Sequence, residues 1–162
     1  MNNMSIMWAG VFALAGWFWI YLFCRQLIFN FTVAYPLIKK MQETDRDLIA
    51  DSSKKYTSTS TVVMILIMAI IAFAVVFFFR TPYMIISFAV GAVVCLLMLL
   101  GKIKPSDRHF FDSFCTSYYR FVPDDALRTA MYNCKPSQMK LRLHDMNLST
   151  AFIPSFKEEN KD

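Results

Sequence analysis

The side chains that could do chemistry in this sequence are few, and most lie in its last third. They are His109, Cys115, Cys134, His144 and Asp145. A thiol beside an imidazole is a nucleophile with its general base, but the two side chains must meet in the fold. On a helix, His109 and Asp112 would share one face, within reach of an orienting hydrogen bond. No spacing brings a cysteine to a histidine, and we therefore expect no catalytic residue.

The cysteines and histidines also lack the pattern of a metal site. Zinc ligands cluster at short spacings such as C-x2-C, and Cys24, Cys95, Cys115 and Cys134 contain no such pair. A disulfide framework is not expected in the reducing compartment where the last two cysteines are predicted to lie. The chain has only four glycines and no phosphate-binding glycine motif. We expect no metal and no cofactor.

Chemistry inside a membrane usually requires a charged or strongly polar side chain at bilayer depth. Three apolar blocks dominate the sequence, and the second and third contain no charged residue. Ser87 is the most polar side chain in the middle of the third block, while Arg25 follows the first. This absence predicts a protein that is not an enzyme and that forms no selective pore by itself.

Composition explains why these blocks are read as membrane spans. Hydrophobic residues make up 56% of the 162 residues, above the roughly 45–50% of soluble chains, and the mean hydropathy is +0.39. The net charge is +5, but the basic residues flank the apolar blocks instead of forming a dense run with interleaved aromatics. The charge therefore indicates membrane orientation, and we expect no nucleic acid partner.

The second and third blocks, residues 61–79 and 84–100, each approach the ~20 residues that cross a bilayer. Pro82 separates them, since it lacks a backbone donor and suits the first turn of a new helix. The first block is ambiguous. A span over residues 6–24 leaves Arg25 at the interface, whereas a span over residues 18–38 would bury its charge near the bilayer centre at a cost of about 2.5–3.5 kcal/mol. We prefer the first span.

This choice leaves residues 27–38 as an apolar extension, which lies on the membrane interface or is covered by protein. The chain then divides into a first span with its extension (1–38), a cytoplasmic loop (39–60), a helical hairpin (61–101) and a cytoplasmic C-terminal region (102–162). The loop mixes both charges and is expected to be solvated, with a helix at most in its first half.

The distribution of basic residues sets the direction. Basic side chains follow the first and third spans, while the N-terminus has none and the hairpin tip has one. The positive-inside rule places the N-terminus outside and the C-terminus in the cytoplasm. The expected membrane-interface anchors are Arg25, Lys39, Lys40, Arg80, Lys102 and Lys104. A bacterial inner membrane is expected, because no eukaryotic sorting signal is recognisable.

The C-terminal region is predicted to be mostly helical. A helix over 106–121 would carry an aromatic stripe of Phe110, Phe114, Tyr118 and Phe121, joined by Phe111 and Cys115. A second helix over 125–133 would be capped by Asp124. A third would follow Pro136, since a lone strand has nothing to pair with. So small a region buries little surface alone, and the aromatic stripe is predicted to dock it on the membrane, the loop or another subunit.

Small side chains predict a helix-packing surface. Ser87, Gly91 and Cys95 recur every four residues, which allows a second helix to approach closely. Ala9 and Ala13 make a weaker stripe in the first span. The stripe is either an interface with another chain or an internal contact with the second span.

These observations predict an all-α membrane protein with three transmembrane helices. Its expected function is that of a non-catalytic integral membrane subunit of a larger assembly for secretion, transport or envelope maintenance. Its partners would be the lipid bilayer and other membrane subunits or further copies of itself. The alternative is a small transporter or channel component that forms its pathway by homo-oligomerisation, lined by Ser87 and Cys95 with Arg25 at its mouth.

Overall fold

The computed structural model describes residues 3–78 and 81–156, with side chains from residue 6 onward. This part of the chain is all-helical and contains no strand. Three of its helices are long and apolar enough to cross a membrane, which indicates a membrane-embedded protein. The chain forms two compact units, one of residues 1–28 and 59–102 and the other of residues 29–58 and 103–162.

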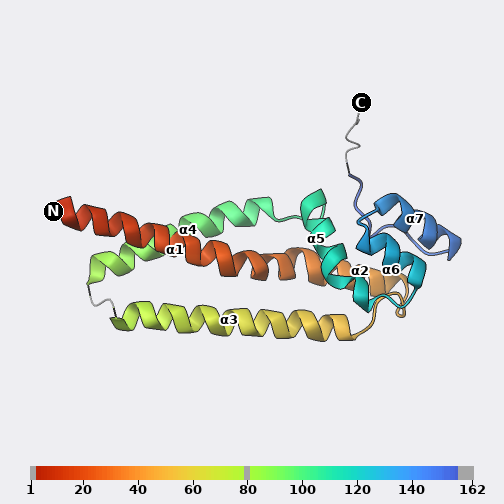
Figure 1. Ribbon diagram of the computed structural model, residues 1–162, viewed down its shortest axis with the longest axis horizontal. Helices are drawn as coiled ribbons and strands as arrows, with labels where there is room; N and C mark the ends of the chain where they lie inside the picture. Colours follow the sequence, from red (N-terminus) through yellow and green to blue (C-terminus); the bar gives the residue numbers. More distant parts are fainter. Residues whose placement is uncertain (1–2, 79–80, 157–162) are drawn as a thin grey trace, which may run out of the picture. The chain divides into compact units, whose positions relative to one another are not determined.

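The first unit is built from the long apolar helices α1 (Asn3–Phe29), α3 (Ser52–Phe78) and α4 (Pro82–Lys102). At 1.5 Å per residue, α3 and α4 extend for about 40 and about 30 Å, enough to cross the hydrocarbon of a bilayer. In Figure 1, α1 and α4 run in the same direction and cross, and α3 runs in the opposite direction. The prediction of three spanning helices is confirmed at this level.

The first helix does not end where the sequence suggested. Beyond Phe29 it continues through a π-helical turn (Asn30–Ala34) into α2 (Tyr35–Thr44). Pro36 explains the turn, because it has no N–H and its ring displaces the carbonyl group four residues earlier. The Tyr35 N–H instead bonds to the carbonyl oxygen of Asn30, five residues back. The predicted extension is thus helical and continuous with the span, and Val33, Ala34, Leu37 and Ile38 are buried by protein.

The second unit has its own apolar core. It combines α2 and the first two turns of α3 with α5 (Arg108–Tyr118), a 3₁₀ turn (Tyr119–Phe121), α6 (Asp125–Tyr132) and α7 (Pro136–Asp145). Its largest fully buried side chains include Ile38, Met41, Ile49, Phe111, Phe114, Leu127, Met131, Met139 and Leu143. Sequence segments from both sides of the hairpin therefore share one core.

The segment over residues 39–60 was predicted to be a solvated loop; most of its residues are exposed, but it is largely helical. Helix α2 runs to Thr44 and α3 already begins at Ser52, so only residues 45–51 are not helical. Even there, Leu48 and Ile49 are buried. The first helix of the C-terminal region also begins later than predicted, at Arg108, because Asp107 is its N-cap and accepts the His109 N–H at 2.9 Å. Its α-helical part ends at Tyr118, not at Phe121.

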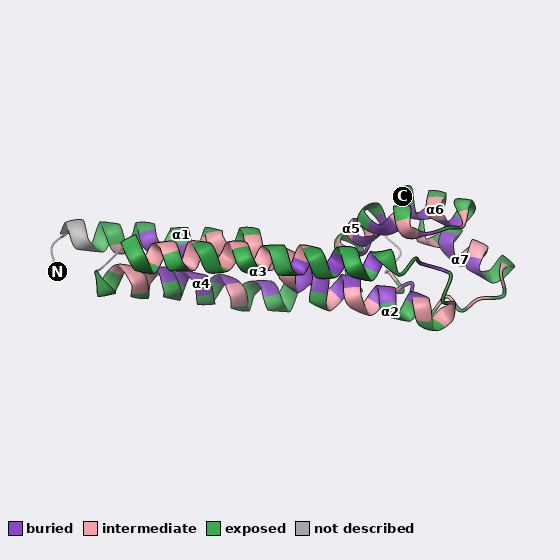
Figure 2. Cartoon of the chain, turned by 90° about the horizontal axis from the view of Figure 1, so that it is seen from below, coloured by how far each residue is buried: buried purple, intermediate pink, exposed green. Residues whose placement is uncertain are grey.

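Burial differs sharply among the apolar helices (Figure 2). Most side chains of α3 between Val62 and Phe78 are exposed, whereas α4 buries Phe88, Gly91, Cys95 and Leu99. Within the first unit, α4 is therefore packed more closely against its neighbours than α3 is. The exposed apolar surface of α3 suits lipid or another apolar helix.

Candidate functional site

Two glycines let α1 and α4 touch backbone to backbone. A Cβ atom built on Gly91 would lie 2.7 Å from the carbonyl carbon of Ala13, and one built on Gly16 would lie 2.9 Å from that of Phe88. Real Cβ contacts are essentially never below 3.0 Å. At this crossing each position must be glycine, because any side chain would clash with the backbone of the other helix. Close contacts at small residues are common where membrane helices pack together. Beside the crossing, the rings of Trp19 and Phe88 are 5.3 Å apart.

The small-residue stripe therefore has a partner inside the chain. Gly91 and Cys95 are buried, and Gly91 contacts α1 instead of the second span that the sequence suggested. Ala13 is half-buried at this crossing and Ala9 is half-buried one turn earlier. The Ser87 hydroxyl donates to the Tyr83 carbonyl at 2.8 Å and is satisfied within its own helix.

The aromatic stripe of α5 packs within the second unit. Phe114 and Tyr118 are buried and stacked with ring centroids 4.8 Å apart, and Phe111 and Cys115 are buried with them. Phe110 is only half-buried and lies 6.5 Å from Phe29. Tyr118 and the half-buried Phe121 also contact Tyr56 of α3. The stripe thus docks on segments of the same chain, around the start of α3.

A buried hydroxyl pair joins α5 to α3. The Thr57 and Tyr118 hydroxyl oxygens are 2.7 Å apart, and the Thr57 hydroxyl also donates to the Ser53 carbonyl at 2.8 Å. Burial raises the pKa of Tyr118 above its usual value, although its hydrogen bond with Thr57 acts in the opposite direction. The Ser53 hydroxyl is buried and has no hydrogen-bond partner in the described part of the chain. The Thr57 and Tyr118 hydroxyls thus connect α3 to α5 where the two helices pack together.

Sequence reasoning missed this polar contact. Ser53, Thr57 and Thr61 are all buried, and they recur at four-residue spacing on one face of α3. That spacing was visible, but it lies in a run of serine, threonine and lysine residues without an apolar stripe. From the sequence alone such a run resembles a solvated loop. In the structure, Tyr118 of α5 contacts Thr57 in this run.

Ion pairs hold the outer helices of the second unit together. Arg142 on α7 donates to both carboxylate oxygens of Asp124, at 3.1 and 2.7 Å. The same carboxylate caps α6 by accepting the Leu127 N–H at 2.8 Å. The hydrogen bonds from Arg142, followed by that from the backbone, lower the pKa of Asp124 to about 2. Asp124 therefore fixes both the start of α6 and the position of α7.

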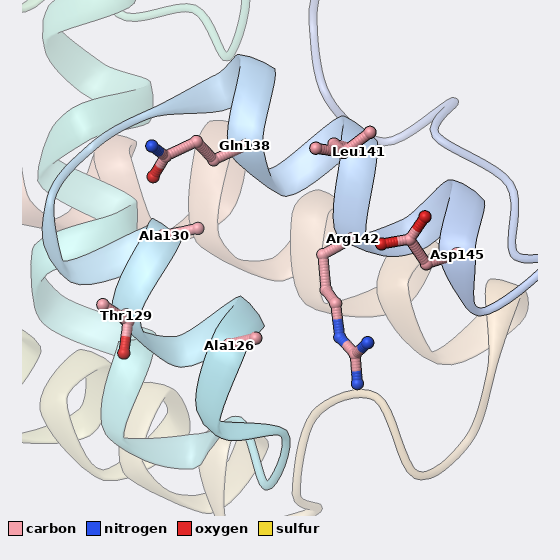
Figure 3. Close-up of a pocket in the computed structure, with 7 residues that line it drawn as sticks. All are labelled: Ala126, Thr129, Ala130, Gln138, Leu141, Arg142 and Asp145. Atoms are coloured by element: carbon pink, nitrogen blue, oxygen red, sulfur yellow. The ribbon is translucent and has the colours of Figure 1, made fainter.

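An open cavity of about 400 Å³ lies between α6 and α7. Figure 3 shows its lining, which is Ala126, Thr129 and Ala130 on α6 with Gln138, Leu141, Arg142 and Asp145 on α7. The lining contains no cysteine or histidine, and its arginine is already paired with Asp124. In chemical terms the cavity could accept a small or extended molecule, and its lining offers hydroxyl, amide and carboxylate groups.

The two thiols among the catalytic candidates lie in settings that do not activate them. Desolvation by burial raises the pKa values of Cys115 and Cys134, the reverse of what activates a thiol. The Asp112 carboxylate, which shares a helix face with His109, accepts two hydrogen bonds from Arg108 at 2.9 and 3.0 Å. Among the described residues no group of three potential metal ligands gathers.

The predicted anchors are divided between the two units. Arg25 is half-buried, with its guanidinium 5.9 Å from the centre of the Tyr21 ring. Lys39 pairs with Glu43 at 3.7 Å, and Lys40, Lys102 and Lys104 are exposed. Arg80 lies outside the described residues.

Comparisons of the chain with protein-family models, curated proteins and solved structures find no match. The function must therefore be argued from the helices and contacts described above.

Proposed function

We propose that this chain is a non-catalytic integral membrane subunit of a larger assembly for secretion, transport or envelope maintenance. Its spanning helices would pack on other membrane subunits or further copies, and its second unit would face the cytoplasm. The observation that carries the proposal is the surface of α3. Residues 62–78 hold no charged side chain and are mostly exposed. This helix therefore offers an apolar surface for contact with another helix, without the charged side chain that transport or catalysis inside a membrane usually needs.

The second unit supports the same proposal. Two-thirds of its sequence follows the last span, and it forms a folded core without a cofactor pattern among its described residues. A folded unit attached to spanning helices offers a second surface for contact with neighbouring proteins. Membrane subunits commonly hold their place through two such contacts, one in lipid and one in water.

The proposed location is a bacterial inner membrane, with the N-terminus outside and the C-terminus in the cytoplasm. Its support is the charge distribution, because exposed Lys54 and Lys55 lie near the start of α3 and exposed Lys102 and Lys104 lie at or just beyond the end of α4. The opposite ends carry Arg80 alone.

The homo-oligomeric pathway has less support. Cys95 is buried inside the chain, and the Ser87 hydroxyl is engaged by its own helix. Cys95 is therefore not available to line a path between copies in this arrangement. We therefore keep one proposed function.

The experiment is extraction of the full chain from its native membrane in a mild detergent, followed by measurement of the complex mass and identification of co-purifying proteins. A complex much larger than 18.8 kDa that contains other membrane proteins in fixed stoichiometry is the expected result. A monomer or a pure homo-oligomer would overturn the proposal. A matched extraction of the Gly10→Ala variant controls for handling, since Gly10 has nothing within 4 Å of an added Cβ.

A further inference from the structure

Arg120 has an unusual setting in the second unit. Its guanidinium carbon lies 4.7 Å from the centre of the Tyr56 ring and 5.2 Å from that of Phe121. The side chain is exposed. Cation–π contacts of this kind hold a guanidinium in place while its N–H groups stay available to an anion.

The other arginines of the C-terminal region are neutralised. Arg108, Arg128 and Arg142 each pair with an aspartate, whereas no described carboxylate forms an ion pair with Arg120. Lys55, which precedes Tyr56 on α3, is also exposed and without an ion pair among the described residues. Arg120, which lies over the Tyr56 ring, and Lys55, which precedes Tyr56 in α3, are thus two positive charges that the described part of the protein does not neutralise.

The position of Tyr56 along α3 sets the depth of these charges. The last charge before the uncharged stretch of α3 is Lys55, and a hydrocarbon core of ~30 Å covers about 20 residues, ending near Thr59 if it begins at Phe78. Tyr56 is three residues further, or about 5 Å, which falls within the headgroup layer. Tyrosine is enriched at this depth, and the cation–π contact holds Arg120 there as well.

We infer that Arg120, Lys55 and Tyr56 bind the phosphate of an anionic phospholipid headgroup. The guanidinium supplies paired N–H donors for the phosphate oxygens, the ammonium adds a second positive charge, and the phenol ring fixes the arginine. The lipid would join α3 to the 3₁₀ turn that carries Arg120. This inference does not depend on the proposed subunit function, because it concerns only the membrane surface around one chain.

The test uses the full chain in lipid nanodiscs and measures, by spin-label EPR, the association of labelled phosphatidylglycerol relative to labelled phosphatidylcholine. Arg120→Ala should lower the relative association constant about fivefold, the effect of one basic residue near a charged surface. Lys55→Ala should lower it similarly, and Arg120→Lys by less. Arg128→Ala is the matched control, because Arg128 is paired with Asp125, and it should leave the constant unchanged.

Three results would overturn the inference. One is an unchanged constant in Arg120→Ala while the second unit keeps wild-type protease resistance. Another is an equal loss in Arg128→Ala. The third separates the sources of phosphate: inorganic phosphate added at constant ionic strength should not displace the labelled lipid, and displacement would show a site for free anions. Tyr56→Phe retains the ring and should bind as the wild type, so loss of binding there would also count against the cation–π arrangement.

Discussion

The Thr57 and Tyr118 hydroxyl oxygens are 2.7 Å apart in the buried contact between α3 and α5. Both side chains are almost inaccessible to solvent, and neither can exchange its partner for water. Helix α3 continues from this point into the uncharged stretch that is long and apolar enough to span a membrane. The hydroxyl pair therefore connects the C-terminal region to the first turns of α3, which belong to the second unit.

Removing one member of this pair should destabilise the second unit. Thr57→Val leaves the buried Tyr118 hydroxyl without its partner, which costs about 1–3 kcal/mol. Tyr118→Phe should cost less, because the Thr57 hydroxyl keeps its bond to the Ser53 carbonyl. The measurement is amide hydrogen exchange of α5 in the full chain, where each variant should exchange faster than the wild type. Ser113→Ala is a suitable control, because that hydroxyl bonds only to the His109 carbonyl of its own helix in an exposed position.

The double variant sharpens this prediction. With both hydroxyls removed, neither member of the pair is left without its partner, so the loss should be smaller than the sum of the two single losses. Additive losses would mean that the two hydroxyls do not interact in solution.

The glycine crossing gives a second prediction. Gly91→Ala would force α4 away from α1, because the new Cβ would meet the Ala13 backbone. Forced overpacking costs about 1–3 kcal/mol, and the variant should unfold at a lower fraction of SDS in mixed micelles than the wild type. Gly10→Ala adds the same methyl group to an open face of α1 and should unfold no earlier than the wild type.

A larger residue at the same position tests the interface interpretation of the stripe. Gly91→Leu should lower stability while leaving the mass of the detergent-extracted complex unchanged, since the Gly91 contact lies inside the chain. A change of complex mass without loss of monomer stability would instead place the stripe at an interface with another chain.

The sequence predicted the three apolar helices because length, absence of charge and Pro82 are local features. It placed the end of the first span before Arg25 and left residues 27–38 as an extension, which the structure shows to be helical and continuous with α1. In the structure Pro36 produces only a π-helical turn, with the Tyr35 N–H bonded to the Asn30 carbonyl, and the helix goes on. A proline alone does not distinguish a break from such a turn.

The contacts of the second unit were harder to predict. Phe114 was recognised as part of an aromatic stripe, but its stacking partner Tyr118 contacts Thr57, which lies 61 positions away along the chain. Ser53 and Thr57 lie in a polar run that a period-based argument assigns to solvent, yet both are buried, and α5 contacts Thr57 through Tyr118. Helical pattern predicts which face is apolar; it does not predict which segment covers that face.

Burial separates two members of the predicted docking stripe. Phe114 is 1% exposed, whereas Phe110 is half-buried at the edge of the same helix. Phe114→Ala should therefore cost about 3–5 kcal/mol and release the C-terminal region to limited proteolysis. Phe110→Ala should cost clearly less and leave protease resistance near that of the wild type. Equal sensitivity of the two variants would mean that the stripe docks on something other than the core of the second unit.

The Asp124–Arg142 pair makes stability depend on pH. The pKa of Asp124 is lowered to about 2 in the folded chain from its ordinary 3.8. A carboxyl group with a lowered pKa stabilises the fold above its unfolded pKa, and this contribution is lost as the pH falls through the folded value. The contribution of Asp124 should therefore be complete above about pH 4 and should disappear towards pH 2.

Two substitutions at this position separate charge from capping. Asp124→Asn keeps a good N-cap but loses the ion pair, whereas Asp124→Ala loses both and should cost an additional 0.5–2 kcal/mol or so at neutral pH. Hydrogen exchange of the α6 amides, compared with the wild type at each pH, should show Asp124→Asn less protected at pH 6 and equally protected near pH 2. Because Arg142 is partly exposed, added salt should reduce the difference at pH 6. A difference that persists unchanged down to pH 2 would show that the carboxylate acts through something other than its charge.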